Sequence, residues 1–531
     1  MSTPSRFPPL DPAAYAWKPS SNVPNQWLRR ALGGETLWIP RPKDYHQMFI
    51  GGALTLGSPT LRSVVDRAVK CAWRRLRFDV PELAVSGGYG QDNNAYMLYE
   101  VPQSDDAVDH WVKRTSCLEC GKTRTSVEEL LEKVRQKTKG HASEQVFLFL
   151  NLVVEDDSDL VTKVDFMLNA DHQVTDGIGI RIIIGRFFAL LAQSLHAPAT
   201  VEERLDWKES VTNLSPPWIQ VVNEQQVLSG PDYEQGAEAN EEIIFQQMPQ
   251  NPGLPLLPIA ETPTQKTHFI TISTHQTAAL LRNVKSIINP SSNITHLGHA
   301  AMVLALLRSN RPTYPSQRLF SPCWLNGRRY LKPSPSLPKP PKSYIPICQS
   351  FAPIVFSGLD HLNLKRSATN NEIREVLGKA CREATEEYGR IRKRESMLPE
   401  CVVMFERLGK NMFLKGILET PLAPATGRIN TASDQQDVIP VRTADPFFLS
   451  DGITEQYIDH VYFDQSSRKV FEVDNIMIKS GLADQTNRIV RMSNWRGSIT
   501  VSGEWKECDY DGAMIVAFLK DMVEIMLSIT E

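Results

Sequence analysis

With 531 residues, the chain is longer than the size at which a single hydrophobic core stops growing, so we expect two lobes. Hydrophobic residues make up 41% of the chain and charged residues 22%, as in an ordinary globular protein. The formal net charge of -3 gives no reason to expect binding to nucleic acid or to an anionic membrane surface. Any partner should be small or recognised locally.

The N-terminal segment and the cysteines point to an intracellular protein. Residues 1–21 carry several prolines and lack the apolar core of a signal peptide, so we expect a surface arm and a cytoplasmic location. The eight cysteines are scattered, which favours free thiols in a reducing compartment. Cys117 and Cys120 form a lone CxxC without a second pair, so we expect no metal site there. His296 and His299, one turn apart on a predicted helix, are interpreted as a cap and a packing residue rather than as metal ligands.

The first predicted elements are a strand and an amphipathic helix. Residues from His46 to Leu56 favour an extended chain, and Ser58 and Pro59 predict the start of a helix with Ser58 as its cap. The helix has apolar side chains on one stripe and basic side chains elsewhere, which is typical of packing against a core. The stripe consists of Leu61, Val64, Val65, Ala68, Ala72 and Leu76.

Further elements lead to the middle of the first lobe. Strands are predicted from Asn94 to Val101 and from Val146 to Val154, and a short helix from Val127 to Thr138. The second of these strands is apolar on both faces, so it belongs in the middle of a covered sheet. The glycine-rich stretch from Ser86 to Gly90 is not followed by a helix, and we interpret it as a hairpin turn rather than a phosphate-binding loop.

The most informative stretch is residues 169–177, with the sequence NADHQVTDG, where an apolar strand ends and an apolar helix begins. His172 lies between two elements that we expect to be buried, so its ring should be held rigidly. An imidazole titrates near neutral pH and suits the removal of a proton from an alcohol, amine or thiol that attacks an acyl group. Asp176 is too far along the turn to be presumed a hydrogen-bond partner of His172, and Gly177 is expected to allow a backbone conformation that a β-carbon would forbid. The alternative is a structural histidine at a strand end.

The helix after this stretch runs from Ile178 to Leu195 and is apolar on nearly every face. Arg181, Arg186 and Gln193 interrupt it, so it lacks the unbroken apolar length of a membrane span. We predict a core helix and no membrane partner.

A change of composition suggests where the lobes meet. Between Asp206 and Thr267, eight prolines punctuate a polar and acidic run, which predicts a crossover segment. The predicted organisation is an N-terminal lobe of residues 1–205, a crossover of residues 206–267 and a C-terminal lobe of residues 268–531. The elements predicted in the second lobe are strands at 268–273 and 498–501 and helices at 276–287, 295–307, 372–394 and 515–525.

The order of these parts resembles the chloramphenicol-acetyltransferase-like superfamily of CoA-dependent acyltransferases and peptide-synthetase condensation domains. Two stretches carry the resemblance, DHQVTDG at 171–177 and LNGRRYL at 325–331, with support from residues 46–76 and from SNWRGSITVSGEW at 493–505. Within the superfamily the chain is most similar to the fungal trichothecene 15-O-acetyltransferase type. The resemblance implies an α/β fold of two lobes, each a mixed sheet covered by helices, with the active site in the channel between them.

The resemblance also implies roles for single residues. His172 would be the general base that deprotonates an acceptor hydroxyl as it attacks a thioester carbonyl. Asp176 would turn away from the substrate and pair with Arg328, so that this pair, together with Gly177 and Asn326, supports the loop that aims His172. Thr426, which precedes a glycine, would donate to the tetrahedral oxyanion, although such a threonine is often a plain turn residue.

Two departures narrow the subfamily. Asp171 stands where condensation domains have the first of two histidines, and the DFGWG motif of plant BAHD acyltransferases does not occur in the chain. Both subfamilies are therefore disfavoured.

The function implied by the resemblance is an acyl-CoA-dependent O-acyltransferase. Acetyl-CoA would be its co-substrate and a small hydroxylated terpenoid or polyketide its acceptor, with no metal, no permanently bound cofactor and a monomeric state. The alternatives are a condensation-type enzyme that uses a carrier-protein thioester and a catalytically silent binding homologue. Basic residues are mixed with acidic ones along the chain, so no basic patch for a carrier protein is evident. The intact His172, Asp176 and Gly177 argue against the silent alternative.

Overall fold

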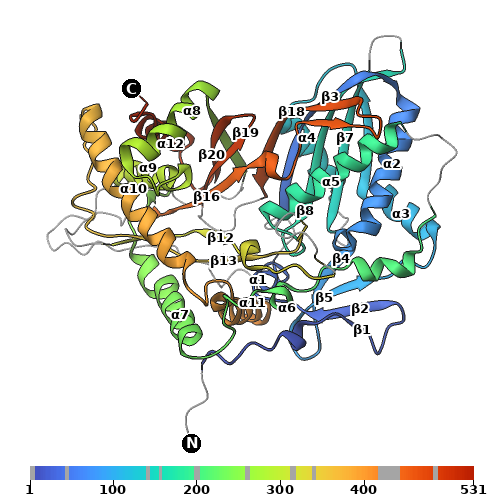
Figure 1. The fold of residues 1–531 in the computed structure, drawn as a ribbon, viewed down its shortest axis with the longest axis horizontal. Helices are drawn as coiled ribbons and strands as arrows, with labels where there is room; N and C mark the ends of the chain where they lie inside the picture. Colours follow the sequence, from blue (N-terminus) through green and yellow to red (C-terminus); the bar gives the residue numbers. More distant parts are fainter. Residues whose placement is uncertain are drawn as a thin grey trace, which may run out of the picture.

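The computed structural model describes residues 6–41, 47–138, 144–154, 158–196, 204–257, 264–310, 318–335, 337, 343–415, 443–481 and 488–530. Two helix-covered sheets occupy the two halves of the molecule, and a third sheet with short helices lies below them in the view of Figure 1.

The first sheet has six strands in the order β17-β18-β3-β8-β7-β6. β6 runs parallel to β7 and the other neighbours are antiparallel, so the sheet is mixed. The strands are β3 (Gln47–Leu61), β6 (Ser116–Gly121), β7 (Val146–Val154), β8 (Leu160–Asp171), β17 (Val461–Phe463) and β18 (Lys469–Ser480).

Helices cover both faces of this sheet. On β7, Leu148 and Leu150 pack in the cluster that includes α2 and α5, while Phe147 and Phe149 pack against α4 on the other face. This two-sided burial explains why β7 is apolar throughout, and it confirms the predicted central strand. The helices are α2 (Arg62–Asp79), α3 (Asp105–Thr115), α4 (Val127–Thr138) and α5 (Gly177–Leu195).

The helix α5 is the one helix, among the described residues, that is long and apolar enough to cross a membrane by length and composition. Most of it is buried inside the protein. Its buried apolar side chains, among them Ile180, Phe187 and Leu195, pack against α2 and the six-stranded sheet, as in a core helix.

The second sheet has the order β10-β20-β19-β16, with β16 and β19 parallel and the other pairs antiparallel. Its helices include α9, in which every residue from His296 to Arg308 is buried. The two mixed, helix-covered sheets confirm the predicted fold class. The elements are β10 (Gln265–Ile272), β16 (Pro446–Ile453), β19 (Arg488–Trp495), β20 (Ser498–Lys506), α8 (Thr274–Asn283), α9 (Ile294–Ser309), α10 (Asn370–Arg392) and α12 (Gly512–Leu527).

Smaller elements complete the fold. A third sheet has the order β1-β2-β5-β4, and three two-stranded pairs join β11 to β14, β12 to β13 and β9 to β15. The strands are β1 (Lys18–Pro19), β2 (Gln26–Arg30), β4 (Val85–Tyr89), β5 (Ala95–Glu100), β9 (Leu254–Pro255), β11 (Leu319–Ser321), β12 (Trp324–Asn326), β13 (Gln349–Phe351), β14 (Ile354–Phe356) and β15 (Thr443–Ala444). The helices are α1 (Gly34–Trp38), α6 (Trp218–Val221), α7 (Pro231–Glu242) and α11 (Val402–Lys415).

The C-terminal part of the chain returns to the first sheet. β18 pairs with β3 over a long register, from Phe471 opposite Leu56 to Ser480 opposite Met48. In Figure 1 this late strand therefore lies beside β3, an early strand of the other half. The lobe boundaries at residues 205 and 267 stay a prediction, and the crossover between them contains the helix α7.

Two predicted local features are wrong. The helix expected from Pro59 begins at Arg62, because β3 resumes its pairing with β8 at Thr60 and Leu61 after an irregularity. Pairing with a neighbouring strand outweighs the local cap signal of Ser58. The glycines expected in a hairpin turn form the strand β4, and the turn follows from Gly90 to Asn94.

Candidate active site

His172 lies in the turn between β8 and α5, and its ring stacks on the indole of Trp38 from α1. The ring centroids are 4.4 Å apart and the planes meet at 11°. The Nδ1 atom is buried and has no well-aligned hydrogen-bond partner among the described residues. Nε2 is therefore the nitrogen left to face a substrate. No pattern in the sequence indicates Trp38, because it lies 134 positions upstream of His172.

The environment keeps the imidazole neutral. Burial lowers the pKa of His172 below its ordinary value, and the nearby charge of Arg491 lowers it further. The carboxylate of Asp176 and the backbone groups of His172 and Thr175 act in the opposite direction but do not overcome burial. A neutral imidazole is the form that can accept a proton.

The turn is anchored on both sides of His172. The side chain of Gln173 donates to Gln145 at 2.5 Å and accepts from the Gly87 amide at 2.9 Å. The Thr175 hydroxyl donates to the carbonyl of Ile345 at 2.9 Å. These bonds limit the freedom of the turn, as a positioned base requires.

Asp176 has a structural set of contacts. Its Oδ1 accepts from the amides of Ile178 and Gly179 at 3.0 and 2.9 Å, which caps α5, and its Oδ2 accepts from the amide of Cys348 at 3.0 Å. Burial alone would raise the pKa of this carboxyl, but the guanidinium of Arg328 outweighs burial and the pKa is lowered. No hydrogen bond joins Asp176 to His172 among the described contacts.

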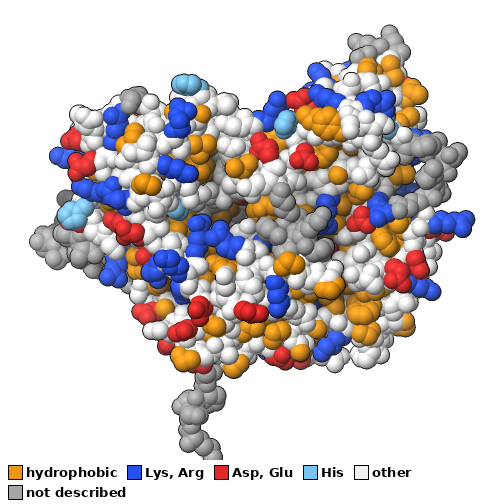
Figure 2. All heavy atoms as spheres, viewed as in Figure 1, with side chains coloured by type: hydrophobic (Ala, Val, Ile, Leu, Met, Phe, Trp, Pro, Cys, Tyr) orange, Lys and Arg blue, Asp and Glu red, His pale blue; other side chains and the backbone are white. Residues whose placement is uncertain are grey.

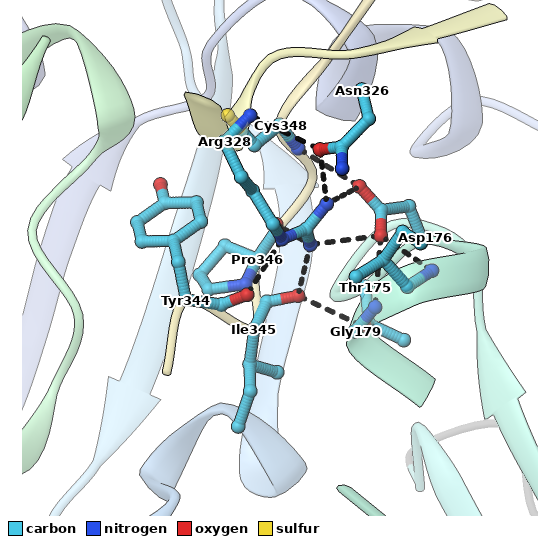
Figure 3. Close-up of polar contacts among 10 residues, drawn as sticks. Thr175, Asp176, Gly179, Asn326, Arg328, Tyr344, Ile345, Pro346 and Cys348 are labelled. Carbon is cyan, nitrogen blue, oxygen red and sulfur yellow. Dashed lines mark hydrogen bonds and ion pairs between the residues drawn. The ribbon is translucent and has the colours of Figure 1, made fainter. Parts of the chain in front are cut away.

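Arg328 and Asp176 form a bidentate ion pair, shown in Figure 3. Nη1 donates to Oδ2 and Nη2 to Oδ1, each at 2.8 Å, and both side chains are almost fully buried. Nε donates to the carbonyl of Tyr344 at 2.8 Å, and Nη2 also reaches the carbonyl of Pro346 at 3.0 Å. The pair implied by the resemblance is therefore present, and it joins the start of α5 to the segment after β12. Its role in catalysis stays a prediction.

Two glycines near the site differ from the expectation. Gly177 has an ordinary backbone conformation, and a β-carbon added to it would meet no atom within 4 Å. The expected need for glycine at this position is therefore wrong. Gly179 is the position that excludes a side chain, because a β-carbon there would overlap the Thr175 hydroxyl and the carbonyl oxygen of Ile345.

A cavity of about 250 Å³ lies against His172. Both sheets contribute to it, through Ile478 of β18 in the first and Leu449 of β16 and Ile489 of β19 in the second. Its lining is largely apolar and aromatic, and includes Trp38, Met48, Trp324, Phe351, Phe405 and Phe447. Such a lining suits a compact apolar ligand with few polar groups.

A buried cluster of charges borders the cavity on the side of the second sheet. Asp451 pairs with Arg181 at 2.7 Å and with Arg491 at 2.9 Å, and Arg491 also reaches Glu504 at 3.4 Å. These four residues come from α5, β16, β19 and β20, so no local pattern in the sequence brings them together. The cluster links the helix that follows His172 to the second sheet.

The remaining predicted residues have varied outcomes. Asn326 is exposed at the end of β12, and its side-chain oxygen accepts from the amide of Arg328 at 3.0 Å. Thr426 lies outside the described residues, so its predicted contact with the oxyanion stays a prediction. His296 bonds to Asn293 and Thr385, in keeping with a structural role.

No group of three or more His, Cys, Asp or Glu side chains suited to a metal ion occurs within the described ranges. The eight cysteines, all within those ranges, are free thiols. His299 is buried and hydrogen-bonded to Tyr388 and Ser321.

Comparisons with known proteins show which family the chain is similar to. The 15-O-acetyltransferase Tri3 family matches residues 7–406. The chain is 24% identical to trichothecene 15-O-acetyltransferase TRI3 of Fusarium sporotrichioides over 99% of both chains. It is also 24% identical to the putative 15-O-acetyltransferase SAT12 of Stachybotrys chartarum, over 98% of this chain and 92% of that one.

Solved structures share the fold. The Fusarium sporotrichioides TRI3 structure superposes with a TM-score of 0.84 at 21% identity, covering 99% of this chain and 100% of that one. The condensation domain of the polyketide synthase MokA superposes with a TM-score of 0.56 at 12% identity, covering 95% of this chain and 97% of that one. The family match spans most of the sequence and includes both His172 and the Asp176–Arg328 pair, and the chain therefore belongs to the 15-O-acetyltransferase Tri3 family of O-acetyltransferases.

Proposed function

We propose that the enzyme transfers the acetyl group of acetyl-CoA to a hydroxyl of a trichothecene or a closely related terpenoid. The observation that carries this proposal is a neutral, rigidly held imidazole, that of His172, facing a largely apolar cavity in a member of this family. The names of the relatives in Fusarium and Stachybotrys support a 15-hydroxyl as the position that is acetylated.

In the proposed reaction His172 is the general base. Its Nε2 takes the proton of the acceptor hydroxyl while the hydroxyl oxygen attacks the thioester carbonyl carbon. The tetrahedral intermediate then expels the CoA thiolate, which recovers the proton from the imidazolium. Asp176 has no direct part, because its oxygens are occupied by Arg328 and by backbone amides.

The cavity suits this acceptor class. Removing a terpenoid skeleton from water against aromatic and aliphatic side chains is favourable, at about 25 cal/mol per Å² of apolar surface buried. Excluding water also protects the thioester from hydrolysis. Thr426 remains our proposed donor to the oxyanion. We further propose that the enzyme acts as a monomer in the cytoplasm, which is in keeping with its free thiols.

The test is an assay of the purified enzyme with acetyl-CoA and a trichothecene that carries a free 15-hydroxyl. The expected product is the monoacetylated trichothecene, identified by mass and by the position of the new ester. Parallel reactions contain an acetylated carrier protein in place of acetyl-CoA. Product from acetyl-CoA alone supports the proposal, whereas product only from the carrier protein would replace the donor, and no product from either would contradict the proposed acceptor.

A further inference from the structure

Two arginine side chains near the site, Arg329 and Arg392, have no acidic partner within the described part of the chain. Arg329 follows Arg328 in the short turn after β12, and its side chain is exposed. Arg392 is the last residue of α10 and is half-buried. The hydroxyl of Tyr330 donates to the carbonyl oxygen of Arg392 at 2.9 Å, so the turn and the helix end are in direct contact.

Two arginines close to Arg392 on the chain do have acidic partners. Arg390 pairs with Glu387 at 2.8 Å, and Arg394 pairs with Glu400 at 2.6 Å. Arg392 instead lies over the ring of Tyr388, with its guanidinium carbon 5.4 Å from the ring centroid. The arginines two residues before and two residues after Arg392 are thus each paired with a carboxyl group, while Arg392 has no such partner among the described residues.

The two free guanidinium groups act on each other. Burial lowers the pKa of Arg392, and the charge of Arg329 lowers it further. Together with burial, the charge of Arg392 also lowers the pKa of the nearby His296 to about 4. Holding two like charges together costs free energy unless an anion binds between them.

The turn that carries Arg329 adjoins the catalytic cavity. Arg328, the residue directly before Arg329, lines that cavity, and so does Asn326. Figure 2 shows Lys and Arg side chains gathered beside a hollow near the middle of this face, in the region where β12 lies in Figure 1. An anionic group bound there could remain outside the cavity while an attached chain reached toward His172.

We propose that Arg329 and Arg392 form a phosphate subsite for the phosphate-bearing part of acetyl-CoA. This inference rests on the proposed function, because it takes acetyl-CoA as the donor. Guanidinium groups suit phosphate oxygens, since their planar N–H pairs can make two parallel hydrogen bonds to one phosphate. The acetyl-pantetheine arm would then extend from this subsite into the cavity.

The first test is CoA binding by calorimetry without an acceptor. Arg329→Gln, Arg392→Gln and the double variant are compared with the wild type, and Arg390→Gln is the matched control because its charge is already neutralised by Glu387. Each lost charged hydrogen bond should weaken CoA binding about 10- to 100-fold. Pantetheine, which has no phosphate ester, should bind all variants equally. Rising salt should weaken CoA binding to the wild type more than to the double variant.

A second readout is steady-state kinetics. The substitutions should raise the KM for acetyl-CoA and leave kcat and the KM for the acceptor near their wild-type values. Arg329→Gln alone remains informative if Arg392→Gln fails to fold, because Arg329 is exposed. CoA binding by the double variant as tight as that of the wild type would overturn the inference, as would equal weakening for CoA and pantetheine. A wild-type enzyme that did not use acetyl-CoA would instead contradict the proposed function, so the two failures are distinguishable.

Discussion

His172 and Asp176 lie four residues apart in one turn, yet their side chains differ in how far their hydrogen-bonding capacity is filled. The carboxylate of Asp176 accepts hydrogen bonds from two helix amides, from the Cys348 amide and from both terminal nitrogens of the Arg328 guanidinium. His172 has an aromatic ring as its main contact and no well-aligned hydrogen bond to Nδ1 within the described ranges. A group that must hold the fold has its bonding capacity filled, whereas a group that must react with a substrate keeps some of that capacity free.

The same contrast recurs at the neighbouring pair Arg328 and Arg329. Arg328 is buried and fully engaged with Asp176 and three carbonyl oxygens. Arg329 is exposed and has no acidic partner among the described residues. Arg328 thus serves the structure, whereas Arg329 is left available for the CoA contact that we propose, and substitutions should separate the two roles.

Replacing His172 tests its role as the reacting group and should have the largest effect on activity. His172→Ala should reduce kcat about 10²- to 10⁴-fold, because the acceptor proton loses its positioned base. The free energy of unfolding should fall by only about 0.5–1.5 kcal/mol, since the main contact that the ring makes with the fold is its stacking on Trp38. The measurements are steady-state acetyl transfer and urea unfolding.

The matched control is His275→Ala, which removes an exposed histidine from α8. It should leave both kcat and stability at wild-type values. Undiminished turnover in His172→Ala would show that the proton leaves by another route.

Breaking the buried ion pair of Asp176 and Arg328 tests its structural role. Asp176→Ala or Arg328→Ala leaves one buried charge without its partner and should lower the free energy of unfolding by about 3–5 kcal/mol. The double variant should lose much less than the sum of the two single losses, because neither charge is then stranded. Chemical unfolding of all four proteins gives the coupling energy. Strictly additive losses would show that the two side chains do not depend on each other.

Substitutions of two glycines at the start of α5 test the local packing and should have the smallest effects on stability. Gly179→Ala should destabilise the protein by about 1–3 kcal/mol, because the new methyl group would overlap Thr175 and Ile345. Gly177→Ala should leave the free energy of unfolding unchanged or raise it by about 0.5–1 kcal/mol, because the site is open and alanine favours a helix. Thermal unfolding of both variants decides the matter, and equal losses at the two positions would be evidence against the described packing.

Features that depend on local sequence can be predicted from it, whereas features that depend on distant segments cannot. The bounds of α4 and β7 were predicted correctly, because periodicity and apolar runs are read within one element. The start of α2 at Arg62 differs from the prediction, since pairing of Thr60 with β8 overrides the local cap signal of Ser58. Family resemblance located Arg328 against Asp176, which spacing alone could not do. Trp38 and the cluster around Asp451 had no sequence signal, because their members come from widely separated elements.

The most direct test of the account is the pH dependence of kcat/KM for acetyl transfer. His172 acts as a base only when it is unprotonated, so the rate should fall as the pH drops through its pKa. Burial places that pKa below the usual value of about 6.5, so the acid limb should have its midpoint below pH 6.5. The residual activity of His172→Ala should lack this limb. A wild-type midpoint at or above pH 6.5, or the same limb in His172→Ala, would contradict a neutral His172 as the catalytic base.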